Sequence, residues 1–305
     1  MDTRPIPAAR PLAQWRLARR TLQLGRRTLV MGVVNITPDS FSGGMPDAGA
    51  ATAHALALLD EGADLLDLGA ESTRPGSQAG DAAPAVSAGE EQARLLPVLA
   101  AVLRARPDAL ISVDTYKAST ARAALAAGAE IINDVSGFAW DLALAAVCAE
   151  TRCGVVLMHT RGRPSEWLAQ PALATGELLA HVRTGLEASL TTARAAGVAG
   201  DAIVLDPGYG FGKRLDENFA LLARQAELLA LGRPLLAGLS RKSFLGHRLA
   251  ALHGGVSAPV VARENASLAA LVAAILNGAS VVRVHKVKPA VEAACIADAI
   301  LEART

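Results

Sequence analysis

Acidic and basic side chains stand at one end of short apolar segments in this chain. Asp114 and Asp206 each close a run rich in Ile, Val and Leu. Arg283 and His285 alternate along a third run, so both side chains point to the same side of an extended strand. Carboxylates of this kind could accept hydrogen bonds from the N–H groups of a planar heterocycle, while the cations hold an anion beside it.

Other polar residues end further runs of the same kind. Asn133 adds an amide, and Lys242 supplies a cation for a ring carbonyl or nitrogen. Asn35 would complete a compact anion site with the arginine and the histidine. Taken singly, a strand-end Asp is most often a helix N-cap. Ser240 and Ser243 have no obvious activating His beside them, which disfavours acyl-enzyme chemistry.

The apolar runs predict eight strands, each followed by a helix-like stretch. They are continuously apolar, as in a parallel sheet buried on both faces, and their spacing leaves room for a crossover helix. We therefore expect a (β/α)8 TIM barrel, in which all strand ends meet on one face and their polar residues converge. The expected strands are Leu29–Asn35, Leu65–Gly69, Ile111–Asp114, Ile131–Val135, Val155–His159, Ile203–Asp206, Pro234–Leu239 and Val281–His285.

Apolar residues with one-sided helical spacing predict the helices of the barrel. Their expected ranges are Ala50–Glu61, Ala88–Arg104, Ser119–Ala127, Glu177–Ala196, Asp216–Leu229, Arg263–Asn277 and Pro289–Glu302, with another helix starting at Ser243.

We expect one domain over residues 1–305, with an N-terminal extension at 1–28 and the barrel at 29–303. Trp15–Leu17 and Thr21–Leu24 predict a short hairpin that plugs the barrel floor. Gly76–Gly89, rich in Ala, Ser, Gly and Pro, predicts a long mobile loop.

Composition excludes several classes of protein. Although 51% of residues are hydrophobic, the best apolar run, at 266–276, is too short to span a membrane. The formal net charge is +1 and aromatic residues make up 3%, which gives no nucleic-acid face. The N-terminus lacks a secretory signal, and three cysteines without metal-ligand spacing indicate a reducing compartment. We expect a cytoplasmic protein in which Cys148 and Cys153 are buried free thiols.

Seven motifs in order resemble the dihydropteroate synthase family over essentially the whole chain from Leu29 to Glu302. They are Met-Gly-Val-Val-Asn-Ile-Thr-Pro-Asp-Ser-Phe-Ser at 31–42, Glu-Ser-Thr-Arg-Pro-Gly at 71–76, Ile-Ser-Val-Asp-Thr at 111–115, Ile-Ile-Asn-Asp-Val at 131–135, Leu-Asp-Pro-Gly at 205–208, Ser-Arg-Lys-Ser at 240–243 and Val-Arg-Val-His at 282–285.

The resemblance implies condensation of (7,8-dihydropterin-6-yl)methyl diphosphate with 4-aminobenzoate, giving 7,8-dihydropteroate and pyrophosphate. It implies three groups of binding residues: Asp114, Asn133, Asp206 and Lys242 for the pterin; Arg283 and His285, with Asn35 and Mg2+, for the diphosphate; and Thr73, Arg74, Pro75, Phe211, Lys242 and Ser243 for the aminobenzoate. Sulfonamide-type analogues and a homodimer are also implied.

Charge placement indicates a mechanism in which pyrophosphate leaves first and a methylene cation conjugated with the dihydropterin remains. Asp114 and Asp206 would stabilise the cationic ring, and Arg283 and His285 the leaving group. Closure of the loops after the first two strands would exclude water.

Four departures from the family pattern stand out: Gly43 in place of Asp, Thr160-Arg161 in place of Met-Gln, Lys286 in place of Asp, and a longer loop after Gly76. Arg161 and Lys286 would add positive charge near the active site. Two alternatives remain open: a pterin-binding paralogue without catalysis, and a methyltetrahydrofolate:corrinoid methyltransferase. The latter has no need of the 240–243 motif.

Overall fold

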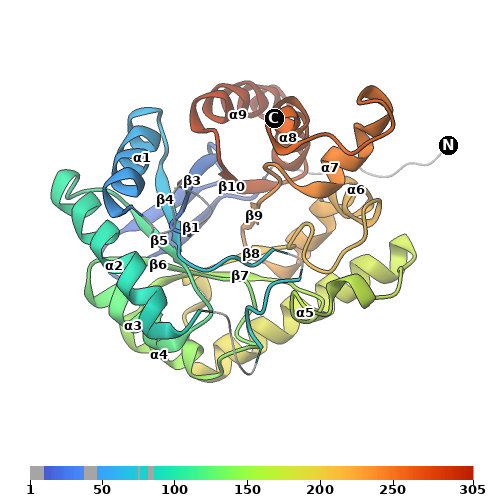
Figure 1. Ribbon diagram of the computed structural model, residues 1–305. Coiled ribbons are helices and arrows are strands. Elements are labelled where there is room, and N and C mark those ends of the chain that lie inside the picture. The colour runs from blue at the N-terminus through green and yellow to red at the C-terminus, as the bar shows by residue number, and fades with distance from the viewer. Residues whose placement is uncertain (1–9, 38–46, 75, 82–85, 305) are drawn as a thin grey trace.

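The strands of the chain close into a barrel surrounded by helices (Figure 1). The computed structural model describes residues 10–37, 47–74, 76–81 and 86–304. Around the barrel the strands follow the order β10-β3-β4-β5-β6-β7-β8-β9, and every neighbouring pair is parallel. The expected (β/α)8 barrel is therefore confirmed.

The barrel strands are short and almost wholly buried, because helices cover one side and the barrel interior covers the other. Their bounds are β3 (Leu29–Asn35), β4 (Leu65–Gly69), β5 (Ile111–Asp114), β6 (Ile131–Asp134), β7 (Gly154–Met158), β8 (Ile203–Asp206), β9 (Leu235–Ala237) and β10 (Ala279–Val284). The expected bounds of β3, β4, β5 and β8 match the structure, whereas β6, β7, β9 and β10 differ by one or two residues at an end.

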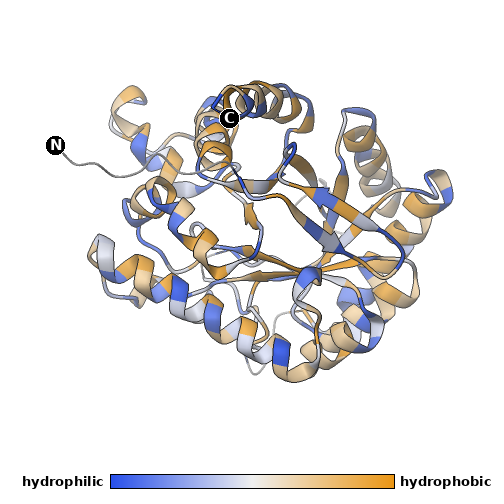
Figure 2. Cartoon of the chain, turned by 180° about the vertical axis from the view of Figure 1, so that it is seen from behind, coloured by the Kyte–Doolittle hydropathy of each residue, from blue (hydrophilic) through white to orange (hydrophobic). Residues whose placement is uncertain are grey.

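The helices form an outer ring around these strands. Their bounds are α1 (Ala48–Asp60), α2 (Ala88–Ala105), α3 (Ala118–Ala126), α4 (Ala143–Thr151), α5 (Thr175–Ala196), α6 (Glu217–Ala223), α7 (Ser243–Arg248), α8 (Glu264–Leu276) and α9 (Val287–Glu302). Figure 2 shows hydrophilic and hydrophobic residues mixed along the helices and mainly hydrophobic strands between them. This distribution is typical of helices that bury one face only.

Two helical segments differ from the expectation. The single helix expected over Asp216–Leu229 is divided into α6 and a 3-10 segment at Gln225–Leu231, because the backbone at Arg224 leaves the α region. The helix α4, between β6 and β7, was absent from the expected set. Its nine residues are mostly Ala, Leu and Val, so they show little of the polar-apolar alternation that marks the other helices.

The N-terminal hairpin closes the floor of the barrel, as expected. It consists of β1 (Ala13–Arg16) paired antiparallel with β2 (Thr21–Leu24). Trp15 is fully buried and packs with Leu65, Val204 and other apolar residues of the barrel floor. Its indole nitrogen donates to the carbonyl of Ala202 over 2.9 Å, which satisfies the one polar group of the side chain.

The larger core lies between the barrel strands and the helix ring and runs around the whole molecule. Each fully buried Leu or Val in it contributes about 1.5–3 kcal/mol relative to exposure. Cys148 and Cys153 are buried free thiols in this core, as expected, and Cys295 is an exposed free thiol. Within the described residues, no helix has the length and apolar character needed to cross a membrane.

Candidate active site

Arg283 forms the centre of a polar cluster at the carboxyl ends of the strands. Its Nε donates to Asp67 Oδ2 over 2.5 Å and its Nη2 donates to Asp114 Oδ2 over 2.7 Å. Asp67 also accepts from Asn133 Nδ2 at 3.0 Å and from Ser112 Oγ at 2.7 Å. A guanidinium carries five N–H donors, so these two contacts leave others for a ligand. Residues of β4, β5, β6 and β10 therefore meet at one point.

Asp114 lies in a setting that disfavours its charged form. Burial raises the pKa of Asp114 to about 7, the charge of Arg283 lowers it, and the neighbouring Asp67 raises it. Gly69 on the adjacent strand has its backbone next to this carboxyl group, since a Cβ there would touch it. A carboxyl group of this kind gains most from a ligand that supplies N–H donors.

Asp206 ends β8 and accepts a hydrogen bond from the backbone N–H of Gly208 over 2.7 Å. Burial raises the pKa of Asp206, and the charges of Lys242, Lys213 and Arg283 lower it. The turn after it requires glycine: Gly208 has a φ of 70°, and a Cβ there would collide with the carbonyl of His159.

Lys242 reaches the same region from the segment between β9 and α7. Its Nζ lies 4.0 Å from the centre of the Phe211 ring, in a cation–π contact. Burial lowers the pKa of Lys242 to about 8, while Asp206 raises it. The backbone of Gly210 lies against this side chain, where a Cβ would touch it. The lysine thus stands between a carboxylate and an aromatic wall.

His285 continues the line of Arg283 past the end of β10. Its Nδ1 lies 3.0 Å from Ser240 Oγ, which also accepts from the His285 backbone N–H at 3.3 Å. The pKa of His285 is lowered to about 3. Burial is the largest cause, and the charges of Arg241, Arg283, Lys242 and Arg74 lower it further. The cations around this neutral imidazole favour the binding of an anion next to it.

Asn35 is the last residue of β3, beside the β10 strand that leads into His285. It is half-buried and pairs in register with Gly69 on β4. An amide oxygen is a suitable ligand for Mg2+, which keeps several waters and takes most other ligands from a bound phosphate. Within the described ranges, no three His, Cys, Asp or Glu side chains gather into a metal cluster.

An apolar cluster also lies at this face of the barrel. It contains Ala79, Tyr116, Val135 and Met158, with Trp140 and Phe211 packed against it. The loop after β4 contributes Ala79, and Gly80 lies so close to the Trp140 ring that a Cβ would collide with it. The loop also bonds to the segment after β7, through Gly76 N to Pro164 O and Ser165 Oγ to Asp81 Oδ1. The described part of the loop, predicted to be mobile, is thus hydrogen-bonded to the segment after β7.

Two polar residues at the carboxyl ends of β6 and β7 point away from the site. Asp134 accepts from the backbone N–H of Ser136 and of Phe138, which caps the turn after β6. His159 follows Met158 and faces α5, where only the absence of a Cβ at Gly185 makes room for the ring. Neighbouring residues of a strand face opposite sides, so Asn133 and Met158 take the inward positions instead.

Arg161, expected to add positive charge near the active site, lies in the loops at this face and has an acidic neighbour. Arg161 is buried and donates to the carbonyls of Gly212 and Pro171, and it lies 3.5 Å from Glu217. Its charge joins the loops after β7 and β8. Lys286 is exposed and lines a cavity of about 360 Å3 bordered by α8 and α9, outside the barrel interior. Gly43 lies outside the described residues.

Of the residues implied for the aminobenzoate, Phe211 and Lys242 are in contact, and Ser243 begins α7. Ser243 also lines a cavity of about 810 Å3 with Gly210 and Gly212. Thr73 is half-buried and Arg74 is exposed, near enough to His285 to lower the pKa of the imidazole. Pro75 lies outside the described residues.

Sequence reasoning missed two charged residues that hold the site together. Asp67 interrupts the run Leu-Leu-Asp-Leu-Gly of β4, and a lone acid inside a buried strand is a usable signal. Lys213 is buried, and its ammonium donates to the carbonyls of Gly208, Phe211 and His159. The sequence feature that could have indicated this role is the glycine-rich run before Lys213, because backbone carbonyls in such a turn lack partners in regular secondary structure and need another donor.

Acids, an amide and cations from separate strands thus surround one region at the carboxyl face of a TIM barrel. This arrangement defines a pterin-binding barrel enzyme, and the family of pterin binding enzymes matches residues 31–285.

The dihydropteroate synthase of Synechocystis is 38% identical over 97% of this chain and 95% of its own length. The dihydropteroate synthase of Escherichia coli is 41% identical over 90% of this chain and 92% of its own length. The Yersinia pestis enzyme, solved with a sulfonamide drug, superposes with a TM-score of 0.84 at 38% identity and covers 95% of this chain and 99% of that one. The Burkholderia cenocepacia enzyme, solved with 7,8-dihydropteroate, gives a TM-score of 0.80 at 39% identity over 96% and 99%. The chain belongs to the dihydropteroate synthase family, and it is a transferase with that activity.

Proposed function

We propose that the cluster around Arg283 and Lys242 is where (7,8-dihydropterin-6-yl)methyl diphosphate condenses with 4-aminobenzoate. One observation carries the proposal: Asp114 and Asp206, far apart in sequence, both act electrostatically on Lys242 at the same end of the barrel, where Arg283 is hydrogen-bonded to Asp114. Burial disfavours the charged form of each of these side chains, and hydrogen bonds to a polar heterocycle would stabilise that form.

The pterin is recognised by hydrogen bonds to its ring nitrogens and amino group. Asp114 and Asp206 accept from N–H groups, Asn133 can donate or accept, and Lys242 donates to a ring nitrogen or carbonyl. Val135 and Met158 offer apolar surface to the ring faces. Burial has already raised the pKa of both carboxyl groups, so N–H donors that stabilise the charged forms contribute directly to affinity.

The diphosphate is held at the other end of the cluster. Arg283 retains free N–H donors, and the His285 imidazole is neutral until an anion arrives. Asn35 would hold Mg2+ through its amide oxygen, together with phosphate oxygens and water. The bound ion would neutralise charge on the leaving pyrophosphate.

The reaction replaces one bond at the methylene carbon. The C–O bond to pyrophosphate breaks first and leaves a cation conjugated with the dihydropterin ring, which Asp114 and Asp206 stabilise. The arylamine nitrogen then forms the C–N bond and releases its proton. Phe211 and Lys242 would form the wall beside this nucleophile. The family resemblance adds Ser243, Thr73, Arg74 and Pro75 to its binding residues. The loop held over the strand ends keeps water from the cation.

Release of pyrophosphate from the dihydropterin diphosphate tests the proposal, measured with and without 4-aminobenzoate and with and without Mg2+. We expect release that depends on both, and a loss of at least about 100-fold in kcat/KM for Asp206→Asn, or roughly 3 kcal/mol of transition-state stabilisation. Tight pterin binding without any product would instead indicate a paralogue that only binds.

Further properties follow from the same assignment. Sulfonamide-type analogues compete with 4-aminobenzoate at the wall formed by Phe211 and Lys242. A homodimer through α8 and α9 would cover Ile296 and Ile300, which are exposed on α9. The chain acts as one domain in the cytoplasm, where free thiols such as Cys148 stay reduced.

A further inference from the structure

Arg241 has an unusual backbone conformation between two residues of the site. Its φ is 61°, in the left-handed region that residues with a Cβ seldom adopt. The preceding Ser240 places its hydroxyl 3.0 Å from His285 Nδ1, and the following Lys242 places its ammonium over the Phe211 ring. The left-handed turn thus separates two consecutive functional side chains toward different parts of the site.

The start of α8 holds this turn from outside the barrel. Glu264 Oε1 accepts from Arg241 Nε at 2.7 Å and lies 2.6 Å from its Nη2. The backbone N–H of Arg241 donates to Ser267 Oγ over 3.0 Å, and Arg263 Nη1 donates to the carbonyl of Arg241 over 3.0 Å. The side chain and both backbone polar groups of Arg241 are therefore engaged. We call Arg263, Glu264 and Ser267 the α8 clamp.

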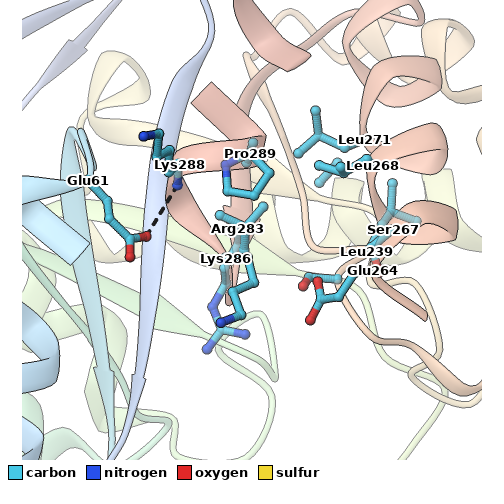
Figure 3. Close-up of a pocket in the computed structure, with 14 residues that line it drawn as sticks. Glu61, Leu239, Glu264, Ser267, Leu268, Leu271, Arg283, Lys286, Lys288 and Pro289 are labelled. Atoms are coloured by element: carbon cyan, nitrogen blue, oxygen red, sulfur yellow. Dashed lines mark hydrogen bonds between the residues drawn. The ribbon is translucent and has the colours of Figure 1, made fainter. Parts of the chain in front are cut away.

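The α8 clamp is built into the surrounding packing. The Ser267 hydroxyl donates a hydrogen bond to the carbonyl of Arg263 over 2.7 Å, and Arg263 also donates to the carbonyl of Ala258 over 2.8 Å. Gly246 of α7 leaves the space that the Arg263 guanidinium occupies. Figure 3 shows Glu264 and Ser267 on α8, across the cavity from Lys286 and Arg283.

Stability alone gives a weak reason for this arrangement. The side chains of Arg241 and Glu264 are 28% and 31% exposed, and an ion pair with that access to water contributes little to folding. Strained backbone persists only where its surroundings over-determine it, and such positions gather at functional sites. The contacts of the α8 clamp converge on one strained residue, which indicates that its conformation is what they maintain.

We propose that Glu264 and the rest of the α8 clamp are positioning residues for the reaction, acting through Arg241 on both Ser240 and Lys242. This inference rests on the proposed function, which gives Lys242 and His285 their roles. Because the turn serves the diphosphate side through Ser240 and the pterin side through Lys242, loosening it weakens both ends of the site together. Lys242 also forms the wall beside 4-aminobenzoate, so a loosened turn should raise the KM of both substrates. A defect confined to the diphosphate side would raise only the KM of the dihydropterin diphosphate.

The matched variants Arg241→Gly and Arg241→Ala test the proposal. Both lack the guanidinium, but glycine adopts a φ of 61° freely and alanine does not. We expect kcat/KM for Arg241→Ala to fall about 5- to 30-fold below that of Arg241→Gly, the factor equivalent to the 1–2 kcal/mol cost of the left-handed region. Glu264→Gln should lower kcat/KM about 10-fold in the parent chain and have little effect in Arg241→Gly, where no strained residue needs holding.

Three controls make the result specific. Glu187→Gln removes the partner of an exposed ion pair on α5 and should leave kcat/KM unchanged. Thermal unfolding of each variant reports loss of folding. The affinity for the dihydropterin diphosphate, measured by calorimetry, shows whether the turn at Arg241 positions its neighbours for binding, independently of catalysis. Equal kcat/KM and equal affinity for the glycine and alanine variants would overturn the clamp. A parent chain that makes no product but whose variants still differ in affinity would overturn the proposed function and leave the clamp standing.

Discussion

The Nε atom of Arg283 lies 2.5 Å from Oδ2 of Asp67 and joins β10 to β4 across the inside of the barrel. Asp67 is fully buried, whereas the Arg283 side chain is 22% exposed at the carboxyl face. The buried carboxylate therefore fixes the arginine from below and leaves its outer N–H groups for substrate. A carboxylate closed to solvent thus fixes the position of the cation that we propose binds the diphosphate.

The variant Asp67→Asn should destabilise the protein and impair catalysis together. Breaking a buried ion pair by removing one charge costs about 3–5 kcal/mol, and the amide recovers part of this by hydrogen bonding. We expect the free energy of unfolding in urea to fall and kcat/KM to drop at least about 10-fold.

The control is Ser112→Ala, which removes a neutral donor to the other oxygen of Asp67 and should cost about 1 kcal/mol without a comparable loss of activity. If Asp67→Asn matched the parent chain in both measurements, the arginine would be held by something else.

Activity should depend on pH through Asp114. Since burial raises the pKa of Asp114 to about 7, the carboxyl group of the free enzyme is protonated below that pH and unable to accept from every pterin N–H. We expect kcat/KM for the dihydropterin diphosphate to fall tenfold per pH unit well below this pKa. In Asp114→Asn the profile should be lower above about pH 7 and lack this step. A step that survives in the variant would assign the titration to another group.

The same carboxyl group should affect stability in the opposite direction. Between its ordinary pKa of 3.8 and about 7, the folded chain binds more protons at Asp114 than the unfolded chain does. Raising the pH through this window therefore lowers the free energy of unfolding. Asp134, whose pKa burial raises to about 6, adds a similar slope. Asp114→Asn should remove its share of the slope in urea titrations at several pH values, and an unchanged slope would contradict the assignment.

Sequence patterns predicted the barrel well because burial on both faces leaves a signal in each strand. The bounds of β3, β4, β5 and β8 follow from their Ile, Leu and Val runs, and the polar residues after them mark the carboxyl face. Which strand-end residue faces inward was harder to predict. At β6 the adjacent polar residues Asn133 and Asp134 compete, and at β7 a difference of one residue exchanges His159 for Met158.

Contacts between distant segments could not be predicted from local patterns at all. Arg161 was expected to add positive charge near the active site because it departs from the family pattern, but its partners there, Glu217 and two carbonyls, lie in other parts of the chain. Nothing local to Arg161 specifies those partners. The left-handed turn at Arg241 likewise depends on Ser267 and Glu264, more than twenty positions away.

Lys213 should support the loop that carries Phe211. Its ammonium donates to the carbonyls of Gly208 at 2.7 Å, His159 at 3.2 Å and Phe211 at 3.3 Å. Lys213→Met removes all three contacts. Gly208 O keeps the backbone N–H of Phe211 and Phe211 O keeps that of Arg161, so the His159 carbonyl is affected most, and a buried acceptor without a partner costs about 1–3 kcal/mol. We expect reduced stability and a higher KM for 4-aminobenzoate, measured by steady-state kinetics and thermal unfolding. Arg214→Ala, an exposed cation in the same loop, is the control, and equal effects of the two variants would refute a specific role for Lys213.

Phe211 should affect arylamine binding more than it affects folding. The ring lies half-buried with the Lys242 ammonium 4.0 Å from its centre, and a cation–π contact of this kind contributes about 0.5–2 kcal/mol. Phe211→Leu keeps apolar bulk but removes the aromatic face, so kcat/KM with respect to 4-aminobenzoate should fall about 3- to 30-fold by the same estimate.

Phe219→Leu provides the comparison, because that ring packs edge-on against Phe244 at 5.0 Å, within the core around α6 and α7. It should lower the unfolding temperature and leave the KM for 4-aminobenzoate near the parent value. The reverse outcome, a lower unfolding temperature but an unchanged KM for Phe211→Leu, would show that Phe211 is a packing residue and that the nucleophile binds elsewhere.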